Sequence, residues 1–567
     1  MSRPQVIVVG AGPTGLMLAI ELGRRGVATL VLSDSTETST SPKATVTQAR
    51  TMEHFRRLGL AETVRATGVP AEHPTDIVYT SRITWHEIAR HRLPSPADAR
   101  RIVREQPERW HTPELTHRSS QMWIEPILLA EARRHASVQI ELGWRVVAFS
   151  DDSDGVTVAA ERVADGQPRV WTGAYLVGCD GAASTVRAQL GIGRGDSAAI
   201  TEFKGRPMFS VHARVPRMFE HIPFAKAWLY AAINTTQRGS CIMLTADEFK
   251  FNFWRPDHWS GDVTKAQIAE IQERMFGRAI DFDVIGYKFW RGGASLVADA
   301  YRRGRVVLAG DAAHLFTPSA GLGYCTGIDD AANLGWKLAA LVQGWGGPEL
   351  LASYEAECRP EALRRTRFAA ECAERLALFK PSPELDQDSP AGERARAQAA
   401  AHFATHLPFQ YDIPGINFGA RYDDSPVIAG DPSAAPAPPA GGPNVYVPTG
   451  VPGGRAPHAW LPDGRALFDA LGPDFTLLVL GLRARDGAAA FRRAAAAFAI
   501  PLAVVELASA PLRELYGADL VLVRPDQIIA WRGAAADVED VLGRVAGWGQ
   551  LRCSRSQRSS LATMLST

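Results

Sequence analysis

The sequence has few cysteines, no long apolar run and almost no net charge, and each absence excludes a class of protein. No apolar run approaches the roughly 20 residues that a membrane-spanning helix needs. The formal net charge is +1, so no general field would draw the chain to nucleic acid or to an anionic membrane. The six cysteines are scattered without a CxxC pair, which argues against a disulfide framework or a zinc site and favours a reducing compartment.

A chain of 567 residues is long enough for about three or four domains, each with its own core. A hydrophobic share of 46% and a charged share of 22% are ordinary for a globular protein, which argues against a disordered chain. The N-terminus lacks the basic start, apolar core and cleavage site of a secretory signal. We therefore expect a multidomain protein of the cytoplasm.

The first informative pattern is a glycine loop between an apolar strand and a helix. Gln5–Val9 is apolar enough for a buried parallel strand, and Leu16–Arg25 is the expected following helix. The loop at 10–15 reads Gly-Ala-Gly-Pro-Thr-Gly, the dinucleotide-binding fingerprint in its required context. Its first glycine permits the tight turn, the second lets backbone approach a pyrophosphate, and the third allows close helix packing.

The residue that would bind the ribose is less clearly placed. An acid is expected about 20 residues after the loop, at the end of the second strand. That strand, Val27–Leu32, is followed by Ser33 and Asp34. Either Asp34 binds the ribose from a shifted turn or Ser33 does so more weakly, and we favour Asp34.

Two later segments also deliver an acidic residue from a strand to a turn. Val306–Ala309 is an apolar strand that stops at Gly310 and Asp311, and a glycine-rich turn then leads to a helix expected from about Ile328. Earlier, the strand at 175–178 delivers Asp180 to a turn. Glycine loops about 300 residues apart can serve one ligand only if the fold brings the chain back on itself. We therefore expect a discontinuous cofactor domain.

Together, these motifs resemble those of the class A flavoprotein monooxygenases, the FAD-dependent aromatic hydroxylases, and the C-terminal part is similar to that of the phenol-hydroxylase branch. The resemblance implies that the first loop binds the adenylate, that Asp180 lies near FAD and the nicotinamide, and that Asp311 holds the ribityl chain. Motifs and resemblance together indicate these FAD-binding residues: Gly10, Gly12, Pro13, Thr14, Gly15, Ser33, Asp34, Lys43, Gln121, Asp180, Gly310, Asp311, Pro318, Gly321, Leu322, Gly323, Tyr324 and Cys325.

The implied function is FAD-dependent monooxygenation. NADH or NADPH reduces the flavin, O2 adds to it as a C4a-hydroperoxide, and one oxygen is transferred to a small aromatic, phenolic substrate. Two alternatives remain: a Baeyer–Villiger-type or other oxygenation of a polyketide or alkaloid, and a decayed flavin-binding scaffold. Thr45, Ala320 and Cys325 motivate the scaffold, since relatives carry other residues there. We expect a homodimer and no metal, because the histidines form no ligand cluster.

No residue that would activate the substrate is identifiable from the sequence. In phenol-hydroxylase relatives an acidic residue can occupy the position that Thr45 holds here. Thr45, Tyr230, His221 and Arg291 are therefore only candidates for the substrate pocket. His314 adjoins the second cofactor loop, and we expect a structural role for it.

The predicted fold is α/β, with a Rossmann-like FAD-binding domain, an inserted antiparallel β-sheet substrate domain and a C-terminal thioredoxin-like domain. Aromatic residues at alternate positions of Phe249–Trp254 predict the sheet and are expected mainly in its core. The β-α-β then β-β-α order beyond residue 475 predicts the thioredoxin-like domain, which has no cysteine pair for redox chemistry. The expected boundaries are 1–75, 117–200 and 296–380 for the FAD-binding domain, 76–116 and 201–295 for the substrate domain, 381–443 for a helix and Pro/Gly-rich linker, 444–550 for the thioredoxin-like domain and 551–567 for a flexible tail.

Overall fold

The computed structural model describes residues 4–196, 207–256, 259, 262–291, 294–430, 442–482, 484–534 and 537–549. The expected tail at 551–567 and the Pro/Gly-rich stretch at 431–441 lie outside the described residues. Within the described part of the chain, no helix combines the length and the apolar character that crossing a membrane requires.

A six-stranded sheet of order β17-β18-β9-β1-β2-β5 forms the base of the nucleotide-binding fold. Its neighbouring strands are parallel except for β17 and β18. The strands are β1 (Val6–Val9), β2 (Thr29–Ser33), β5 (Val138–Leu142), β9 (Tyr175–Gly178), β17 (Arg302–Arg303) and β18 (Val306–Leu308). Three distant parts of the chain thus meet in one sheet, as the separated glycine loops require.

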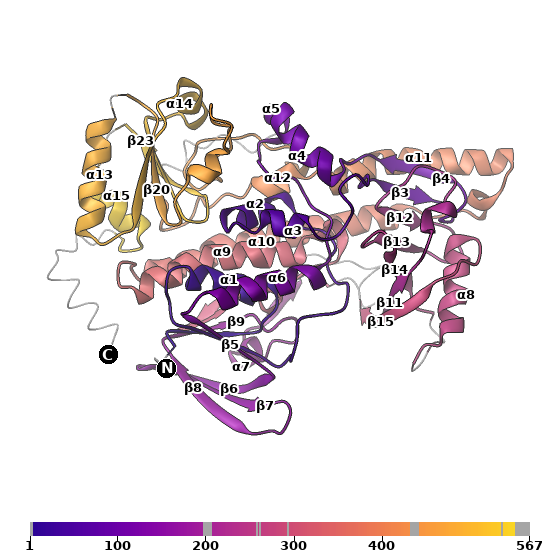
Figure 1. Ribbon diagram of the computed structural model, residues 1–567, viewed down its shortest axis with the longest axis horizontal. Coiled ribbons are helices and arrows are strands. Elements are labelled where there is room, and N and C mark those ends of the chain that lie inside the picture. Colours follow the sequence, from indigo (N-terminus) through magenta and orange to yellow (C-terminus); the bar gives the residue numbers. More distant parts are fainter. Residues whose placement is uncertain are drawn as a thin grey trace.

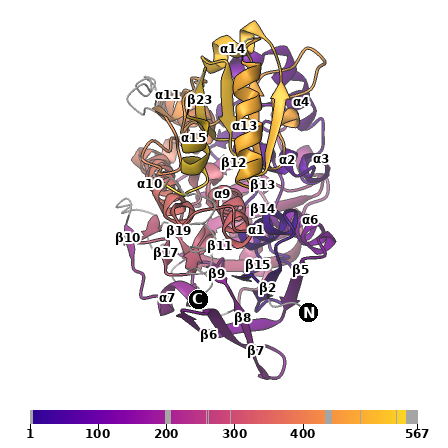
Figure 2. The ribbon, with the colours of Figure 1, turned by 90° about the vertical axis from the view of Figure 1, so that its left-hand side faces the viewer.

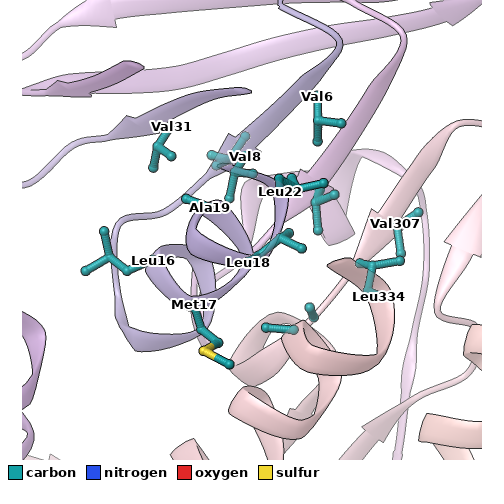
Figure 3. Packing of buried hydrophobic residues seen from close by; sticks show 14 of the residues in the cluster. Val6, Val8, Leu16, Met17, Leu18, Ala19, Leu22, Val31, Val307 and Leu334 are labelled. Atoms are coloured by element: carbon teal, nitrogen blue, oxygen red, sulfur yellow. The ribbon is translucent and has the colours of Figure 1, made fainter. Parts of the chain in front are cut away.

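The core of this domain forms where α1 (Pro13–Gly23) packs against the sheet and against α9 (Gly323–Val342). Val8 of β1 and Leu18 of α1 are fully buried and lie close to Val307 and Leu334 from beyond residue 300 (Figure 3). Burying a side chain of this size contributes roughly 1.5–3 kcal/mol. The core therefore fastens the N-terminal glycine loop to the later one.

A second sheet has seven strands in the order β15-β11-β14-β13-β12-β3-β4. They are β3 (Ile77–Thr80), β4 (Glu87–His91), β11 (Pro207–Arg214), β12 (Leu229–Ala232), β13 (Gly239–Met243), β14 (Glu248–Trp254) and β15 (Asp283–Arg291). The sheet is antiparallel as predicted, except that β12 runs parallel to β3. Parallel neighbours need a long crossover, and the return to the nucleotide fold lies between these two strands.

Strand β14 shows how this sheet separates a core from a cavity. Alternate residues from Phe249 to Phe253 are buried beneath α8 (Lys265–Phe276). Lys250, Asn252 and Trp254 line the cavity on the opposite face. Three of the strand's four aromatics are thus core residues, in agreement with the prediction, and Trp254 is the exception.

Long helices connect the domains. Helices α9 and α10 (Glu349–Leu378) run between the C-terminal domain and the six-stranded sheet, and α11 (Pro390–Tyr411) packs on β4 of the other sheet (Figure 1). The segment expected to be helix and linker, 381–443, thus includes a 22-residue helix in the substrate-domain core. A small sheet is formed by β10 (Arg194–Asp196), β16 (Leu296–Ala298) and β19 (His314–Leu315). The remaining elements of four or more residues are α2 (Ala49–Arg57), α3 (Ala61–Arg65), α4 (Pro96–Glu105), α5 (Pro107–Trp110), α6 (Gln121–Arg134), β6 (Trp144–Asp152), β7 (Gly155–Arg162), β8 (Pro168–Gly173), α7 (Thr185–Gln189), α12 (Pro414–Phe418) and the short 3-10 helices at 383–386 and 467–470.

The C-terminal domain has a four-stranded sheet of order β21-β20-β22-β23, with α13 and α15 on one face (Figure 2). Its elements are β20 (Phe475–Val479), α13 (Arg485–Ala497), β21 (Leu502–Glu506), α14 (Ala510–Tyr516), β22 (Leu520–Val523), β23 (Ile529–Gly533) and α15 (Val538–Val545). This is the predicted β-α-β then β-β-α order with one extra helix, α14. The domain's core includes Trp336 of α9, so it is packed directly on the domain that contains the six-stranded sheet.

Candidate functional site

The first glycine loop leaves open space where its sequence predicts a pyrophosphate. A side chain at Gly15 would place its Cβ only 2.0 Å from the carbonyl oxygen of Gly10, so α1 starts against the loop backbone. Gly10 itself has φ +107°, which favours glycine. A Cβ at Gly12 would meet no atom within 4 Å. The loop is therefore closed on its packing side and open at Gly12, and Pro13 and Thr14 begin the helix that follows.

The second loop is held against the first by close packing. A Cβ at Gly310, which has φ +63°, would lie 2.6 Å from the hydroxyl of Thr14. Asp330 of α9 accepts a hydrogen bond from the backbone N–H of Gly310 at 2.9 Å and lies 2.7 Å from Nε2 of His314. His314 is fully buried, so it orders this loop together with Asp330, in agreement with the structural role expected for it.

Asp311 follows Gly310 in the second loop, and its side chain is exposed although many protein atoms surround it. Burial raises the pKa of its carboxyl, and the nearby charges of His314, Arg194 and Lys43 oppose that rise. Lys43, which is itself exposed, therefore lies near Asp311.

Asp180 and the ribose candidates have different local roles. The Asp180 carboxylate accepts hydrogen bonds from the hydroxyl of Ser184 at 2.5 Å and from the backbone N–H of Val186 at 3.0 Å, so it helps to cap α7. Ser33 ends β2 with a buried side chain whose hydroxyl accepts from the N–H of Ser35. Asp34 is the first residue past that strand and is exposed.

The segment 43–48 is fixed from several sides. The backbone N–H of Gln121 donates to the carbonyl of Ala44 at 2.9 Å, and the Gln121 side-chain amide donates to Glu125. Gln48 donates from its side-chain amide to the carbonyl of Ala320 at 2.7 Å. Ala320 has φ +62°, a left-handed conformation that costs a non-glycine residue about 1 kcal/mol or more. The Gln48 contact thus holds the turn that precedes α9 in a strained geometry.

Cys325 contacts the same segment, at Val46 and Gln48. Its thiol lies 3.6 Å from the carbonyl of Val46, and the backbone N–H of Gln48 approaches its sulfur at 3.4 Å. Burial raises the pKa of the Cys325 thiol to about 11, so it stays protonated at neutral pH. The neighbouring Tyr324 hydroxyl is hydrogen-bonded to Thr47. Tyr324 and Cys325 therefore tie the start of α9 to the 46–48 segment.

A cavity of about 760 Å³ extends from these loops to the seven-stranded sheet. The start of α9 lies in its wall: no side chain caps that helix, and Pro318, Gly321, Leu322, Gly323 and Tyr324 are among the lining residues. The first N–H groups of a helix have no partners within the helix, so they can bind an acceptor. A cavity of this volume is large enough to bury most of a multi-ring ligand.

The four substrate-pocket candidates lie in different places. Thr45 lines the cavity. Tyr230 is fully buried on the core face of the sheet, where its hydroxyl accepts from the N–H of Ala227 at 2.7 Å. This corrects its assignment to the pocket, because neighbouring residues of a strand face opposite sides and it is Leu229 that faces the cavity. His221 is not among the described lining residues either, and the side chain of Arg291 lies outside the described part.

The main polar residues of the cavity were missed in the sequence. A hydrogen-bond chain crosses four strands: the indole of Trp290 donates to Ser210 at 2.8 Å, the Ser210 hydroxyl donates to Asn252 at 2.7 Å, and Asn252 donates to Ser240 at 3.1 Å. Gln48 and the turn at 410–414 also line the cavity. Strand periodicity was the only available signal for the four sheet residues, and no pattern pointed to the turn.

The arrangement fits FAD. The two loops meet through Gly310 and Thr14, the space at Gly12 can take a pyrophosphate, and the exposed Asp311 directly follows Gly310. The uncapped start of α9 then opens on a cavity that is large enough for a ring system. Among the described residues, no group of three or more metal-ligating side chains comes together.

Comparisons with known proteins agree with this geometry. Residues 3–369 match the family model of an FAD binding domain, and residues 449–548 match that of the aromatic-ring hydroxylase C-terminal domain. The chain is 31% identical to the FAD-dependent monooxygenase apdD of Emericella nidulans, over 95% of this chain and 89% of the relative. It is 32% identical to aklavinone 12-hydroxylase RdmE of Streptomyces purpurascens, over 95% and 98%.

Its structure is also similar to that of the rebeccamycin biosynthetic enzyme RebC with reduced flavin. The TM-score is 0.85 at 32% identity, and the alignment covers 96% of this chain and 99% of that one. The glycine loops and the cavity thus occur in a chain that matches known flavoenzymes over nearly its whole length. The chain belongs to the family of FAD-dependent aromatic-ring hydroxylases.

Proposed function

We propose that the protein uses NADH or NADPH and O2 to hydroxylate an aromatic, phenolic substrate in the cavity beneath the seven-stranded sheet. The observation that carries this proposal is the continuity of the cavity, which joins the start of α9 to the polar chain of Asn252 and Ser240. A substrate held there would lie against the same wall as the flavin ring. The names of the relatives that are similar to this chain, among them an aklavinone hydroxylase, support a substrate with several rings.

FAD, when bound, accepts electrons from the nicotinamide and activates O2 for transfer to the substrate ring. The chain's own residues bind and orient. Gly12 would admit the pyrophosphate, Asp311 would accept hydrogen bonds from the ribityl hydroxyls, and Asp34 would bind the ribose. The positive end of α9 would stabilise negative charge on a bound ring by about 0.3–1 kcal/mol, or ~2 kcal/mol when buried.

The sheet and the turn at 410–414 exclude water from the cavity, which protects oxygen transfer from wasteful side reactions. Ser240 and Asn252 are placed to hydrogen-bond the substrate. Thr45 contributes a hydroxyl to the cavity wall and no acid–base group, so the chain carries no carboxylate at this position to deprotonate a phenol.

The test is a panel of mono- and polycyclic phenols assayed with the FAD-loaded enzyme. NADH and NADPH oxidation, O2 uptake and product mass are measured with ¹⁸O2. A phenol-dependent product that carries one labelled ring hydroxyl is expected. A labelled ester or lactone would show that the enzyme catalyses a Baeyer–Villiger reaction and not hydroxylation. The absence of any aromatic-dependent NAD(P)H oxidation would refute the proposal.

A further inference from the structure

The charges that line the cavity are unequal. Four cationic side chains contribute to its wall, from Arg109, Arg118, Arg238 and Lys250, whereas Asp412 is the single acid among the described lining residues. Asp412 is 51% exposed, and its carboxylate lies 3.1 Å from Nε2 of His91. A cavity with this lining favours a ligand that carries negative charge.

Arg118 is the clearest of these cations. Its side chain is 7% exposed, and its guanidinium lies 4.2 Å from the ring centre of Trp228, another residue of the cavity wall. In the described part of the chain, no carboxylate forms an ion pair with it and no acceptor takes a hydrogen bond from it. The Arg118 guanidinium nitrogens are not fully enclosed by protein, so part of their surface is open to the cavity.

Buried arginines are rarely left without an anion, because the loss of hydration is compensated only by pairing. Burial removes water from the Arg118 guanidinium and lowers its pKa to about 10. The tyrosine that acts on this charge most directly is Tyr411, which also lines the cavity and has its own pKa raised by burial. A protonated phenol does not replace a counter-ion.

Lys250, on the sheet, is a second cation that lines the cavity. It projects from β14 into the cavity, and among the described residues it forms no ion pair or hydrogen bond, although the adjacent His212 of β11 pairs with Glu248 at 2.8 Å. Strand register places Leu229, Ile242 and Lys250 side by side across three strands, a distance of about 10 Å between the outer backbones. Trp228, which stacks on Arg118, precedes Leu229 in the chain, and these three residues line the same cavity as Lys250.

We propose that the cavity binds an aromatic substrate through a negatively charged oxygen, a carboxylate or an ionised phenol or enol, with Arg118 and Lys250 as the groups that recognise it. The inference rests on the proposed function and adds the charge of the substrate to it. The two cations select and orient the substrate's ionised form, which for a phenol is also the electron-rich form that accepts an oxygen more readily.

The test measures binding to the FAD-loaded enzyme from changes in flavin absorbance. The carboxylate probe is 2-naphthoate and its neutral counterpart is 2-naphthamide. The phenol probe is 4-nitrophenol, whose ionised form has its own visible absorbance, and its neutral counterpart is 4-nitroanisole. We expect one or both acidic probes to bind at least about 10-fold more tightly than the neutral partner, as is typical of a hydrogen bond to a charged group.

Arg118→Gln and Lys250→Met should each reduce this advantage several-fold, and Arg118→Lys and Lys250→Arg should restore part of it. Matched controls are Lys265→Met on α8, a lysine 67% exposed beyond the opposite face of the sheet, and Arg217→Gln, an arginine 77% exposed. Neither control should change the ratio. FAD content and circular dichroism verify folding of each variant.

Equal binding of acidic and neutral probes by the wild-type enzyme would overturn the inference, and so would an unchanged preference in the double variant. If the Arg118 variants do not fold, the wild-type comparison and Lys250→Met decide the question. A preference for naphthoate identifies the carboxylate as the recognised group, and ionisation of bound nitrophenol identifies the phenolate. Aromatic-dependent NAD(P)H oxidation without any charge preference would leave the proposed function intact and remove only this inference.

Discussion

Glu53 is the residue whose replacement should most clearly loosen the contact between the FAD-binding and C-terminal domains. It is fully buried on α2 and accepts hydrogen bonds from Arg455 at 2.9 Å, from Arg50 at 2.8 Å and from Thr112 at 2.6 Å. Arg50 also donates to Gln527 of the C-terminal domain at 2.6 Å. Replacing Glu53 by Gln keeps the shape but leaves two buried guanidinium groups without their carboxylate.

The magnitude follows from two independent estimates. The Glu53 carboxyl loses hydration on burial, but the charges of Arg455 and Arg50 outweigh that loss and lower its pKa from 4.5 to about 2, which corresponds to about 3 kcal/mol. Removing one partner of a buried ion pair typically costs about 3–5 kcal/mol. We therefore expect Glu53→Gln to lower the free energy of unfolding by about 3 kcal/mol at pH 7.

The assay is urea denaturation, followed by tryptophan fluorescence, of the wild type and of Glu53→Gln. Because the pKa of Glu53 is lowered in the folded state, its contribution is complete above about pH 4.5 and is lost as the pH falls toward 2. The difference between the two proteins should therefore shrink by about 1 kcal/mol at pH 4. Other buried carboxylates titrate in both proteins and cancel in this difference.

A matched control is Glu270→Gln on α8, which removes a carboxylate that is 57% exposed and paired with Arg274 at 2.5 Å. Exposed pairs contribute about 0–1 kcal/mol, so this variant should remain close to the wild type. Equal stability of Glu53→Gln and the wild type at pH 7 would refute the reasoning. A difference that stays constant down to pH 4 would show that the carboxylate's charge is not what stabilises the contact.

Three further substitutions test the cofactor loops. Gly12→Ala should weaken FAD binding by about 10-fold or more in a fluorescence titration, because its Cβ enters the space at the loop without meeting protein; unchanged affinity would place the pyrophosphate elsewhere. Ala320→Gly should raise the thermal unfolding temperature through up to about 1 kcal/mol of relieved strain at φ +62°, and a lowered temperature would contradict that origin. Cys325→Ser should retain the FAD content and the coupling of NAD(P)H oxidation to product, since a hydroxyl can make the same contacts with Val46 and Gln48. Uncoupled turnover at full FAD content would instead indicate that the thiol acts on the flavin.

Much of the geometry of the glycine loops could be predicted because its features are local. Gly10, Gly15 and Gly310 are required by backbone conformation or by close approach, and both constraints leave a mark in the sequence. The apolar strands that precede these loops are equally local. The resemblance to flavoprotein monooxygenases then followed from the order of the motifs, and the family comparisons confirm it.

The substrate cavity could not be predicted in the same way. Tyr230 and Leu229 are neighbours in the chain, but which one faces the cavity depends on the face of β12 that α8 and the surrounding core cover. The turn at 410–414 has no sequence signal for a cavity wall, and it lines the cavity because α11 packs on the sheet. Contacts such as that of Glu53 with Arg455 join residues about 400 positions apart.

The sequence by itself therefore determined the cofactor, the α/β fold class and the family, because steric limits on the backbone and the burial of apolar strands act over a few residues. Only the tertiary structure decided which polar side chains meet: Arg118 and Lys250 at one cavity, and Cys325 against the 46–48 segment. Those encounters depend on strand register and helix packing across several hundred residues. The charge of the cavity, and with it the proposed charge of the substrate, is a property of the folded chain.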